Sequence, residues 1–185
     1  MFEREVRDFS TIKRWTTFRA VHRHSLAEHS FYVALYADQI ATFIQSKCDR
    51  SILLRYCLWH DVEELLSGDL PGPYKRAVGN AEKAREFEMM HNMSRFTGAE
   101  WQVPKDDEII AIVKLANAID EVMYLATEHQ MGNGNVPKLL EQSFNRAVRA
   151  IRRLKLEEEK EFNLLEIFHA AMTEHKIGTN KYLRD

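Results

Sequence analysis

The sequence predicts an all-α protein that folds as a single domain over residues 1–185. Apolar residues recur at helical spacing along most of the chain, and no run shows the alternation of a half-buried strand. Only 7 glycines and 4 prolines interrupt these patterns. A chain of 185 residues, 45% of them hydrophobic, is long enough to bury a core of its own. We therefore expect a bundle of about six or seven helices.

Local signals mark the first two helices. A short helix is predicted over residues 8–16, with the pair Arg14-Trp15 near its end. Ser25 and Glu28 have the spacing of a capping box, in which each side chain bonds to the backbone N–H of the other residue. A second helix should therefore begin there and run to about Lys47. Its expected core residues are Phe31, Leu35, Ala37 and Ile40.

A central helix is predicted from about residue 49 or 51 to residue 66. Its apolar residues recur at helical spacing and should face the core: Leu54, Leu58, Val62 and Leu65. Gly68 suits the left-handed position that follows a helix, and Pro71 prevents continuation. The chain should therefore leave this helix in a loop over residues 67–73, which is placed to line a pocket.

Further helices are predicted in the second half of the chain. Their expected ranges are 80–97, 107–130, 137–154 and 157–176, with a loop over residues 132–135 where Gly and Asn alternate. A basic run on the 137–154 helix has spacings of three and four and is interpreted as a solvated face: Arg146, Arg149, Arg152 and Arg153.

Three residues that could take part in metal binding or catalysis interrupt the apolar pattern of the central helix. His60 and Glu64 are four residues apart and Asp61 and Glu64 are three apart, so Glu64 shares a flank with each. Imidazole and carboxylate are both good ligands for a divalent cation. Adjacent side chains diverge by about 100° on a helix, so His60 and Asp61 need not meet one ion. On these residues alone, a core helix with a hydrogen-bonded histidine and two solvated carboxylates is an equally good interpretation.

The composition of the chain limits which binding partners and which cellular compartment are expected. A net charge of −2 gives no bulk attraction to nucleic acid or to an anionic membrane, so neither is expected as a partner. Cys48 and Cys57 make no disulfide framework, which favours a reducing compartment. The first ten residues contain no apolar signal segment, and no apolar run of membrane-spanning length occurs. A cytoplasmic protein is expected.

Four motifs in order resemble those of the HD-domain metal-dependent phosphohydrolases. They are Arg14-Trp15, then Ala27-Glu28-His29-Ser30, then His60-Asp61 with Glu64, then Gly68-Asp69-Leu70-Pro71. This set is most similar to the bacterial 5'-deoxynucleotidase branch, and it also occurs in phage dATP triphosphohydrolases. The resemblance covers roughly residues 10–135 and implies an all-α HD domain, a nucleotide substrate and a homodimer.

The resemblance also implies a site for one divalent metal ion, of which Co, Mn, Zn, Mg and Fe are all candidates. His29, His60 and Asp61 match three ligands of the family. At the fourth position the family has an aspartate and this chain has Asn117. Asn117 can ligate through its amide oxygen, Asp120 can take its place from one helical turn away, or the Asn can be an engineered change. The sequence leaves these alternatives open.

Roles for the other residues follow from the same resemblance. Glu64 matches the general acid and base, and Arg14 and Lys75 match phosphate contacts. Trp15 matches a residue that lies near the sugar and disfavours a 2'-hydroxyl, although core packing explains it equally well. Asp69 is expected among the substrate-binding residues.

The expected reaction is the hydrolysis of a 5'-deoxynucleoside monophosphate to deoxynucleoside and phosphate. A deoxynucleoside triphosphate triphosphohydrolase is the first alternative, because further basic residues are available for a longer phosphate chain. A metal-depleted nucleotide-binding module is the second, motivated by Asn117. A guanosine-tetraphosphate hydrolase shares the His60-Asp61 pair but fits the Arg14-Trp15 motif less well.

Overall fold

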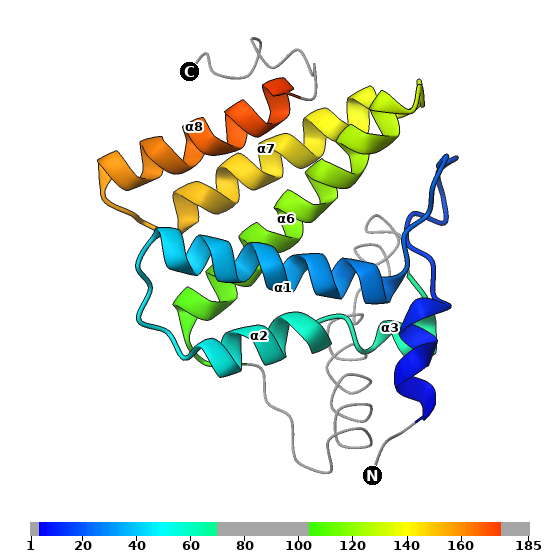
Figure 1. Ribbon diagram of the computed structural model, residues 1–185, viewed down its shortest axis with the longest axis horizontal. Coiled ribbons are helices and arrows are strands. Elements are labelled where there is room, and N and C mark those ends of the chain that lie inside the picture. The colour runs from blue at the N-terminus through cyan, green and yellow to red at the C-terminus, as the bar shows by residue number, and fades with distance from the viewer. Residues whose placement is uncertain (1–3, 70–103, 175–185) are drawn as a thin grey trace, which may run out of the picture.

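The computed structural model describes residues 4–69 and 104–174, and these form an all-α fold (Figure 1). A 3-10 helix, η1 (Arg4–Ser10), is followed by α1 (Leu26–Phe43), α2 (Arg50–Trp59) and the short α3 (Glu64–Ser67). After the gap come α6 (Asp107–Gln130), α7 (Pro137–Arg153) and α8 (Glu158–Glu174). The predicted helix over 80–97, the residues Leu70 to Pro73 and Lys75 lie outside the described residues.

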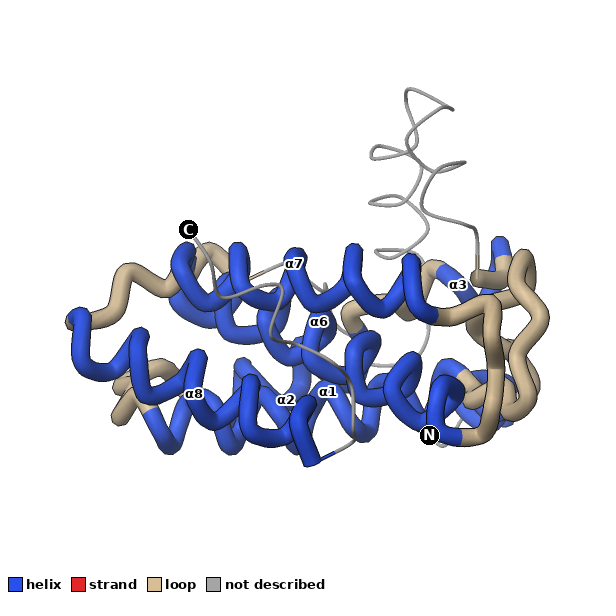
Figure 2. The backbone as a smooth tube through the Cα atoms, turned by 90° about the horizontal axis from the view of Figure 1, so that it is seen from above, coloured by secondary structure: helices blue, strands red, loops and turns tan. Residues whose placement is uncertain are grey.

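Helix α6 is the centre of the bundle. It packs against α1 and α7 (Figure 1). Helix α1 also packs against α2, and α8 packs against α7. Its buried residues lie around most of its circumference, as expected for a helix enclosed by others. Helix η1, the loop that follows it and α3 gather at one end of the bundle (Figure 2). This end holds the candidate site.

Capping residues explain where the long helices begin. The predicted capping box is confirmed: Ser25 Oγ accepts from the Glu28 N–H at 3.2 Å, and Glu28 Oε2 accepts from the Ser25 N–H at 2.6 Å. Asp49 and Asp106 cap α2 and α6 through their carboxylates. The predicted bounds of the 107–130 helix are confirmed, and α7 and α8 begin within one residue of prediction.

The prediction of a helix over residues 8–16 is wrong. The helical turns end at Ser10, and Arg14 and Trp15 lie in the loop that follows. The backbone of this loop bonds to residues at the start of α1: Arg14 N–H donates to His24 O at 3.1 Å and Leu26 N–H to Ile12 O at 2.9 Å. These two bonds flank an isolated antiparallel bridge between Lys13 and Ser25.

The central helix is broken where it was predicted to continue. Helix α2 ends at Trp59, and residues 60–63 form a turn before α3. Backbone N–H groups in this turn bond three residues back, as in Glu64 N–H to Asp61 O at 3.0 Å. This tighter winding changes the relative directions of successive side chains, so the 100° divergence expected for His60 and Asp61 on an α-helix does not apply.

Several predicted core positions are also corrected. Phe31 and Leu35 are 55% and 46% exposed, and Leu58 is 45% exposed. Ala37, Ile40 and Val62 are buried as predicted. The buried face of α1 follows Leu26, His29, Val33, Ala37 and Ile40, which places Phe31 and Leu35 on another face. Helix α1 ends at Phe43 and not near Lys47, because the chain turns at Gln45 with φ 56°.

Within the described ranges, no helix combines the length and the apolar character that crossing a membrane requires.

Candidate metal centre

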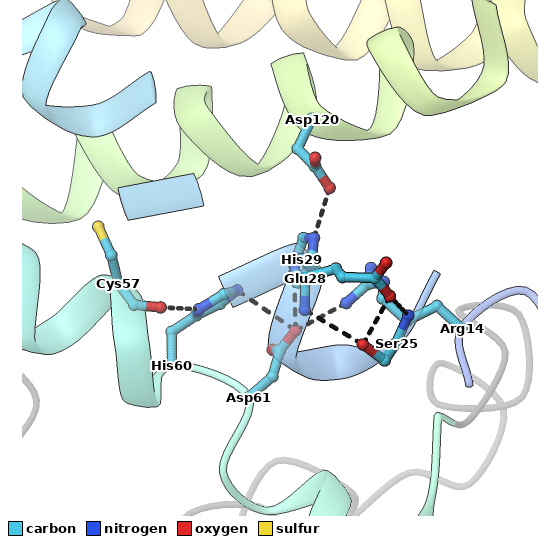
Figure 3. Close-up of polar contacts among 8 residues, drawn as sticks. All are labelled: Arg14, Ser25, Glu28, His29, Cys57, His60, Asp61 and Asp120. Atoms are coloured by element: carbon cyan, nitrogen blue, oxygen red, sulfur yellow. Dashed lines mark hydrogen bonds and ion pairs between the residues drawn. The ribbon is translucent and has the colours of Figure 1, made fainter. Parts of the chain in front are cut away.

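Side chains from three elements converge on the candidate metal centre (Figure 3). His29 comes from the first turns of α1, His60 and Asp61 from the turn between α2 and α3, and Asp120 from the middle of α6. They meet because α1 packs against both α2 and α6. All four side chains are buried.

His29, His60 and Asp61 present their ligand atoms to one point. Asp61 Oδ2 lies 3.5 Å from His29 Nε2 and 3.3 Å from His60 Nε2, and the two imidazole rings are 5.2 Å apart. The three ligand atoms lie within 4.8 Å of one another. Such a set of two nitrogens and one carboxylate oxygen suits a divalent cation of intermediate softness. The structure thus brings together the three residues expected as metal ligands.

The other nitrogen of each imidazole has an acceptor. His60 Nδ1 lies 2.7 Å from Cys57 O, and His29 Nδ1 lies 2.6 Å from Asp120 Oδ2. If each Nδ1 carries the proton, both Nε2 atoms turn lone pairs toward the Asp61 carboxylate. Three electron-rich atoms at this spacing need a cation or a proton between them. Their arrangement therefore fits the metal ion that the sequence predicts.

Opposite charges dominate the electrostatics of this cluster. Burial would raise the pKa of Asp61, but His60, His29 and Arg14 hold it well below its ordinary value. Burial would lower the pKa of His60, and the Asp61 carboxylate raises it instead. Asp61 is therefore a carboxylate at neutral pH, as a metal ligand must be.

Arg14 and Glu64 lie beside the three ligand residues. Arg14 Nη1 donates to Asp61 Oδ2 at 2.9 Å, and the Arg14 side chain is 15% exposed. Burial would lower the pKa of Arg14, but the carboxylates of Asp61 and Glu64 outweigh it and raise this pKa. Glu64 is 2% exposed and opens α3 directly after the turn. A cationic side chain and a buried carboxylate thus flank the candidate metal centre.

Asp69 holds the backbone of Trp15. Its Oδ2 accepts from the Trp15 N–H at 2.8 Å, where Trp15 has a φ of 62°. The indole is half-buried and stacks on Tyr124 at 5.6 Å, and Tyr124 stacks in turn on His24 at 4.4 Å. The direct role of Asp69 is therefore to fix Trp15 in a backbone conformation that residues other than glycine rarely adopt.

Asn117 and Asp120 differ in their surroundings. Asn117 is half-buried on α6, whereas Asp120 is buried on the Nδ1 side of His29. The structure therefore separates Asp120 from the point where His60 and Asp61 meet His29 Nε2. Lys75 lies outside the described residues.

Two further buried residues were not singled out by sequence reasoning. His24 is buried 6.0 Å from the His29 ring, and burial lowers its pKa to about 4, so it is neutral at pH 7. Glu128 is buried on α6 and accepts from the N–H groups of Val21 and His22, both at 2.7 Å. His24 and Glu128 belong to none of the motifs found in the sequence. Neither had a spacing signal.

An all-α bundle in which a His-Asp pair meets a histidine of a preceding helix is the arrangement of the HD-domain phosphohydrolases. The fold agrees with a solved HD-domain phosphohydrolase from Listeria innocua at a TM-score of 0.66, over 91% of this chain and 85% of that one, with 17% identity. The chain belongs to the family described as 5'-deoxynucleotidase YfbR-like, whose model matches residues 1–171.

Curated relatives agree with this family. The chain is 29% identical over 163 residues to the 5'-deoxynucleotidase YfbR of Shigella dysenteriae, covering 77% of this chain and 78% of that protein. It is 27% identical over 140 residues to a 5'-deoxynucleotidase of Pasteurella multocida, covering 67% and 71%. Its fold matches the cyanophage S-2L HD phosphohydrolase DatZ, solved with dA and one catalytic Zn²⁺ ion, at a TM-score of 0.73 and 16% identity, over 94% and 98% of the two chains.

Proposed function

We propose that this protein is a metal-dependent 5'-deoxynucleotidase that hydrolyses deoxynucleoside monophosphates to deoxynucleosides and phosphate. The observation that carries the proposal is the convergence of His29 Nε2, His60 Nε2 and Asp61 Oδ2 beside Arg14 and Glu64. Membership of the YfbR-like family supports the same reaction.

In this proposal His29, His60 and Asp61 would hold one divalent cation, and the fourth position belongs to α6. Asn117 is the candidate there, because Asp120 could take the position only by giving up its contact with His29 Nδ1. A cation held there would supply Lewis-acid chemistry, polarising a phosphoryl oxygen and lowering the pKa of a bound water. The native ion, whether Zn, Co, Mn, Mg or Fe, is left to experiment.

Arg14 binds the phosphate in this proposal. Its guanidinium lies against Asp61, and the side chain is 15% exposed, so a phosphate that approaches the ligand cluster would meet a planar set of donors. Lys75 and Asp69 remain proposed substrate contacts. Trp15 stays a proposed contact to the deoxyribose, supported by its fixed backbone next to Arg14 and its stacking on Tyr124.

Glu64 moves the proton. Its carboxylate is buried next to the His60-Asp61 turn and contributes to the field at Arg14. A carboxylate at this place can take a proton from the attacking water and return it to the leaving 5'-oxygen of the nucleoside.

A triphosphate substrate is the second candidate. Arg19 and Arg23 are exposed on the loop between Arg14 and α1, where they can meet a longer phosphate chain. Release of tripolyphosphate, instead of phosphate, would identify this reaction.

The test is a screen of nucleoside and deoxynucleoside mono-, di- and triphosphates with Mn²⁺, Co²⁺, Mg²⁺ and Zn²⁺, with the products identified. We expect deoxynucleoside and inorganic phosphate from monophosphates. Glu64→Gln should lower kcat by about 10²–10⁴ while metal affinity stays within a few fold of the parent, because Glu64 carries a proton and no metal. Glu63→Gln removes the neighbouring buried carboxylate and is the matched control.

Parent-like turnover by Glu64→Gln would remove Glu64 from the mechanism. If the parent protein hydrolyses none of these nucleotides with any of the four metals, the enzyme proposal fails and the binding module is favoured.

A further inference from the structure

Asp120 and His29 make the shortest described contact of the candidate metal centre. Asp120 Oδ2 lies 2.6 Å from His29 Nδ1, and the two side chains are 5% and 0% exposed. The residues are 91 positions apart in the chain and come from α6 and α1. A hydrogen bond between two buried groups of this kind fixes the orientation of the imidazole ring and determines which ring nitrogen carries the proton.

The two nitrogens of His29 face different groups. Nδ1 faces Asp120, while Nε2 faces Asp61 at 3.5 Å and the His60 ring (Figure 3). A metal ion held by Nε2 would lie on the side of the ring away from Nδ1. Asp120 therefore does not reach that ion while it keeps its bond to Nδ1.

We propose that Asp120 is a positioning residue that holds His29 in the tautomer protonated on Nδ1 and supplies the negative charge that Asn117 lacks. This inference rests on the proposed metal site of the preceding subsection. It gives the two α6 candidates different tasks: the fourth ligand position is left to Asn117 as a neutral ligand, and Asp120 acts on the metal site indirectly, through its contact with His29.

The difference between the two histidines supports this assignment. His60 donates to a neutral acceptor, the carbonyl of Cys57, whereas His29 faces a carboxylate. A carboxylate raises the basicity of the imidazole that donates to it and so strengthens its bond to a metal. With two neutral histidines and Asn117, Asp61 is the only charge among the four candidate ligands. Asp120 adds a second charge without occupying a ligand position.

The first measurement is the tautomer of His29 in the metal-free protein, read from ¹⁵N chemical shifts of the imidazole nitrogens. The parent should show His29 protonated on Nδ1. Asp120→Ala should populate the Nε2-protonated form, because no acceptor then holds the Nδ1 proton. Asp120→Asn keeps an acceptor oxygen and should keep the tautomer. Glu121→Gln, a change to the adjacent carboxylate on α6 that pairs with Arg146, is the matched control and should match the parent.

The second measurement is the affinity for Co²⁺ and Zn²⁺ by calorimetry. Asp120→Ala should bind either ion about 10–100-fold more weakly than the parent, and Asp120→Asn should show a loss in the same direction without a change of tautomer. In the Co²⁺-loaded parent the Nδ1 proton should appear as a hyperfine-shifted exchangeable resonance, which Asp120→Ala should lose.

If Asp120→Ala keeps both the His29 tautomer and the metal affinity of the parent, the proposal is overturned. If Asp120→Asn keeps the metal affinity of the parent, the charge of Asp120 is not what strengthens metal binding. If the Co²⁺-loaded parent lacks the hyperfine-shifted Nδ1 proton, the proposal is also overturned, and Asp120 is favoured as a direct metal ligand. If Asp120→Ala does not fold, Asp120→Asn and the parent spectra still decide. None of these readouts depends on turnover, so they stand apart from the failure of the proposed reaction.

Discussion

Asn117 stands at the position where the resemblance to the family implies an aspartate. It is half-buried on α6, one turn before Asp120. An amide oxygen is a neutral ligand and attracts a divalent cation less than a carboxylate does.

Asn117→Asp should therefore tighten the binding of Zn²⁺ or Co²⁺. We expect an increase of about 10–100-fold, the range by which even outer partners of a ligand change metal affinity. Calorimetric titration of the metal-free protein measures it. Asn145→Asp adds the same charge on α7 and is the control. Equal affinities in the parent and Asn117→Asp would argue that residue 117 does not contact the ion.

Individual site residues were predictable where a motif names them. His29, His60 and Asp61 follow from the family pattern, and the structure brings them together. The contact of Asp120 with His29 was not predictable, because it depends on how α1 and α6 face each other across 91 residues. Sequence spacing placed Asp120 near the site but gave no information on which nitrogen it meets.

Helix α6 does more than carry site residues, because its last turns also fasten the loop before α1. The Glu128 carboxylate accepts from the backbone of Val21 and His22 and from Asn133 Nδ2 at 2.6 Å. Tyr124, one turn earlier, donates its hydroxyl to His22 O at 2.7 Å. The loop that contains Arg14 and Trp15 is thereby fixed to the same helix that contains Asn117 and Asp120.

Glu128→Gln should destabilise the protein by roughly 1–3 kcal/mol at pH 7, because a buried carboxylate with three donors is replaced by an amide that satisfies fewer of them. Chemical denaturation measures this. Glu121→Gln removes a carboxylate from an ion pair with the exposed Arg146 and should cost less than about 1 kcal/mol.

The loss of stability caused by Glu128→Gln should depend on pH. Burial would raise the pKa of Glu128, but the N–H groups of His22 and Val21 lower it below its ordinary value. The carboxylate therefore stabilises the fold above the unfolded-state pKa of about 4.3, and this contribution disappears as the pH falls through the lower folded pKa. The difference between parent and Glu128→Gln should shrink at acidic pH. A difference that stays constant down to the acid transition would contradict this assignment.

Helix ends were predictable where a local signal sets them. Ser25 and Glu28 fix the start of α1, and α6 has its predicted bounds. The break after Trp59 was not predictable, because the sequence from Leu54 to Leu66 is apolar at helical spacing throughout. The chain winds more tightly there because His60 and Asp61 meet His29 of another helix, which is a tertiary constraint.

A bound cation would join parts of the molecule that are distant in sequence. His29 lies in α1 and His60 and Asp61 lie in the α2–α3 turn, so metal binding requires both to be folded and docked. The unfolded chain has no such site, and a ligand that binds only the native state stabilises it.

Saturating metal should therefore raise the melting temperature of the whole protein. At 100 times the dissociation constant the gain is about 2.7 kcal/mol, which corresponds to roughly 5–11 °C for a chain of this size. Differential scanning calorimetry of chelator-treated and metal-loaded protein tests it. His60→Ala should show no such shift. An equal shift in parent and His60→Ala would mean that the metal binds elsewhere.

The bridge between Lys13 and Ser25 has a consequence for how the site keeps its dimensions. Ser25 also caps α1, so the strand-like residues around Arg14 and the first turns that hold His29 are one main-chain unit. Arginine side chains are long and flexible, yet here the origin of the guanidinium is tied to the imidazole through backbone atoms. The distance between the backbone positions of Arg14, the proposed phosphate contact, and His29, the proposed metal ligand, is thus set by main-chain hydrogen bonds. In the proposed reaction this main-chain unit would keep Arg14 and His29 in constant register with each other, whichever side chains cover the outside of the site.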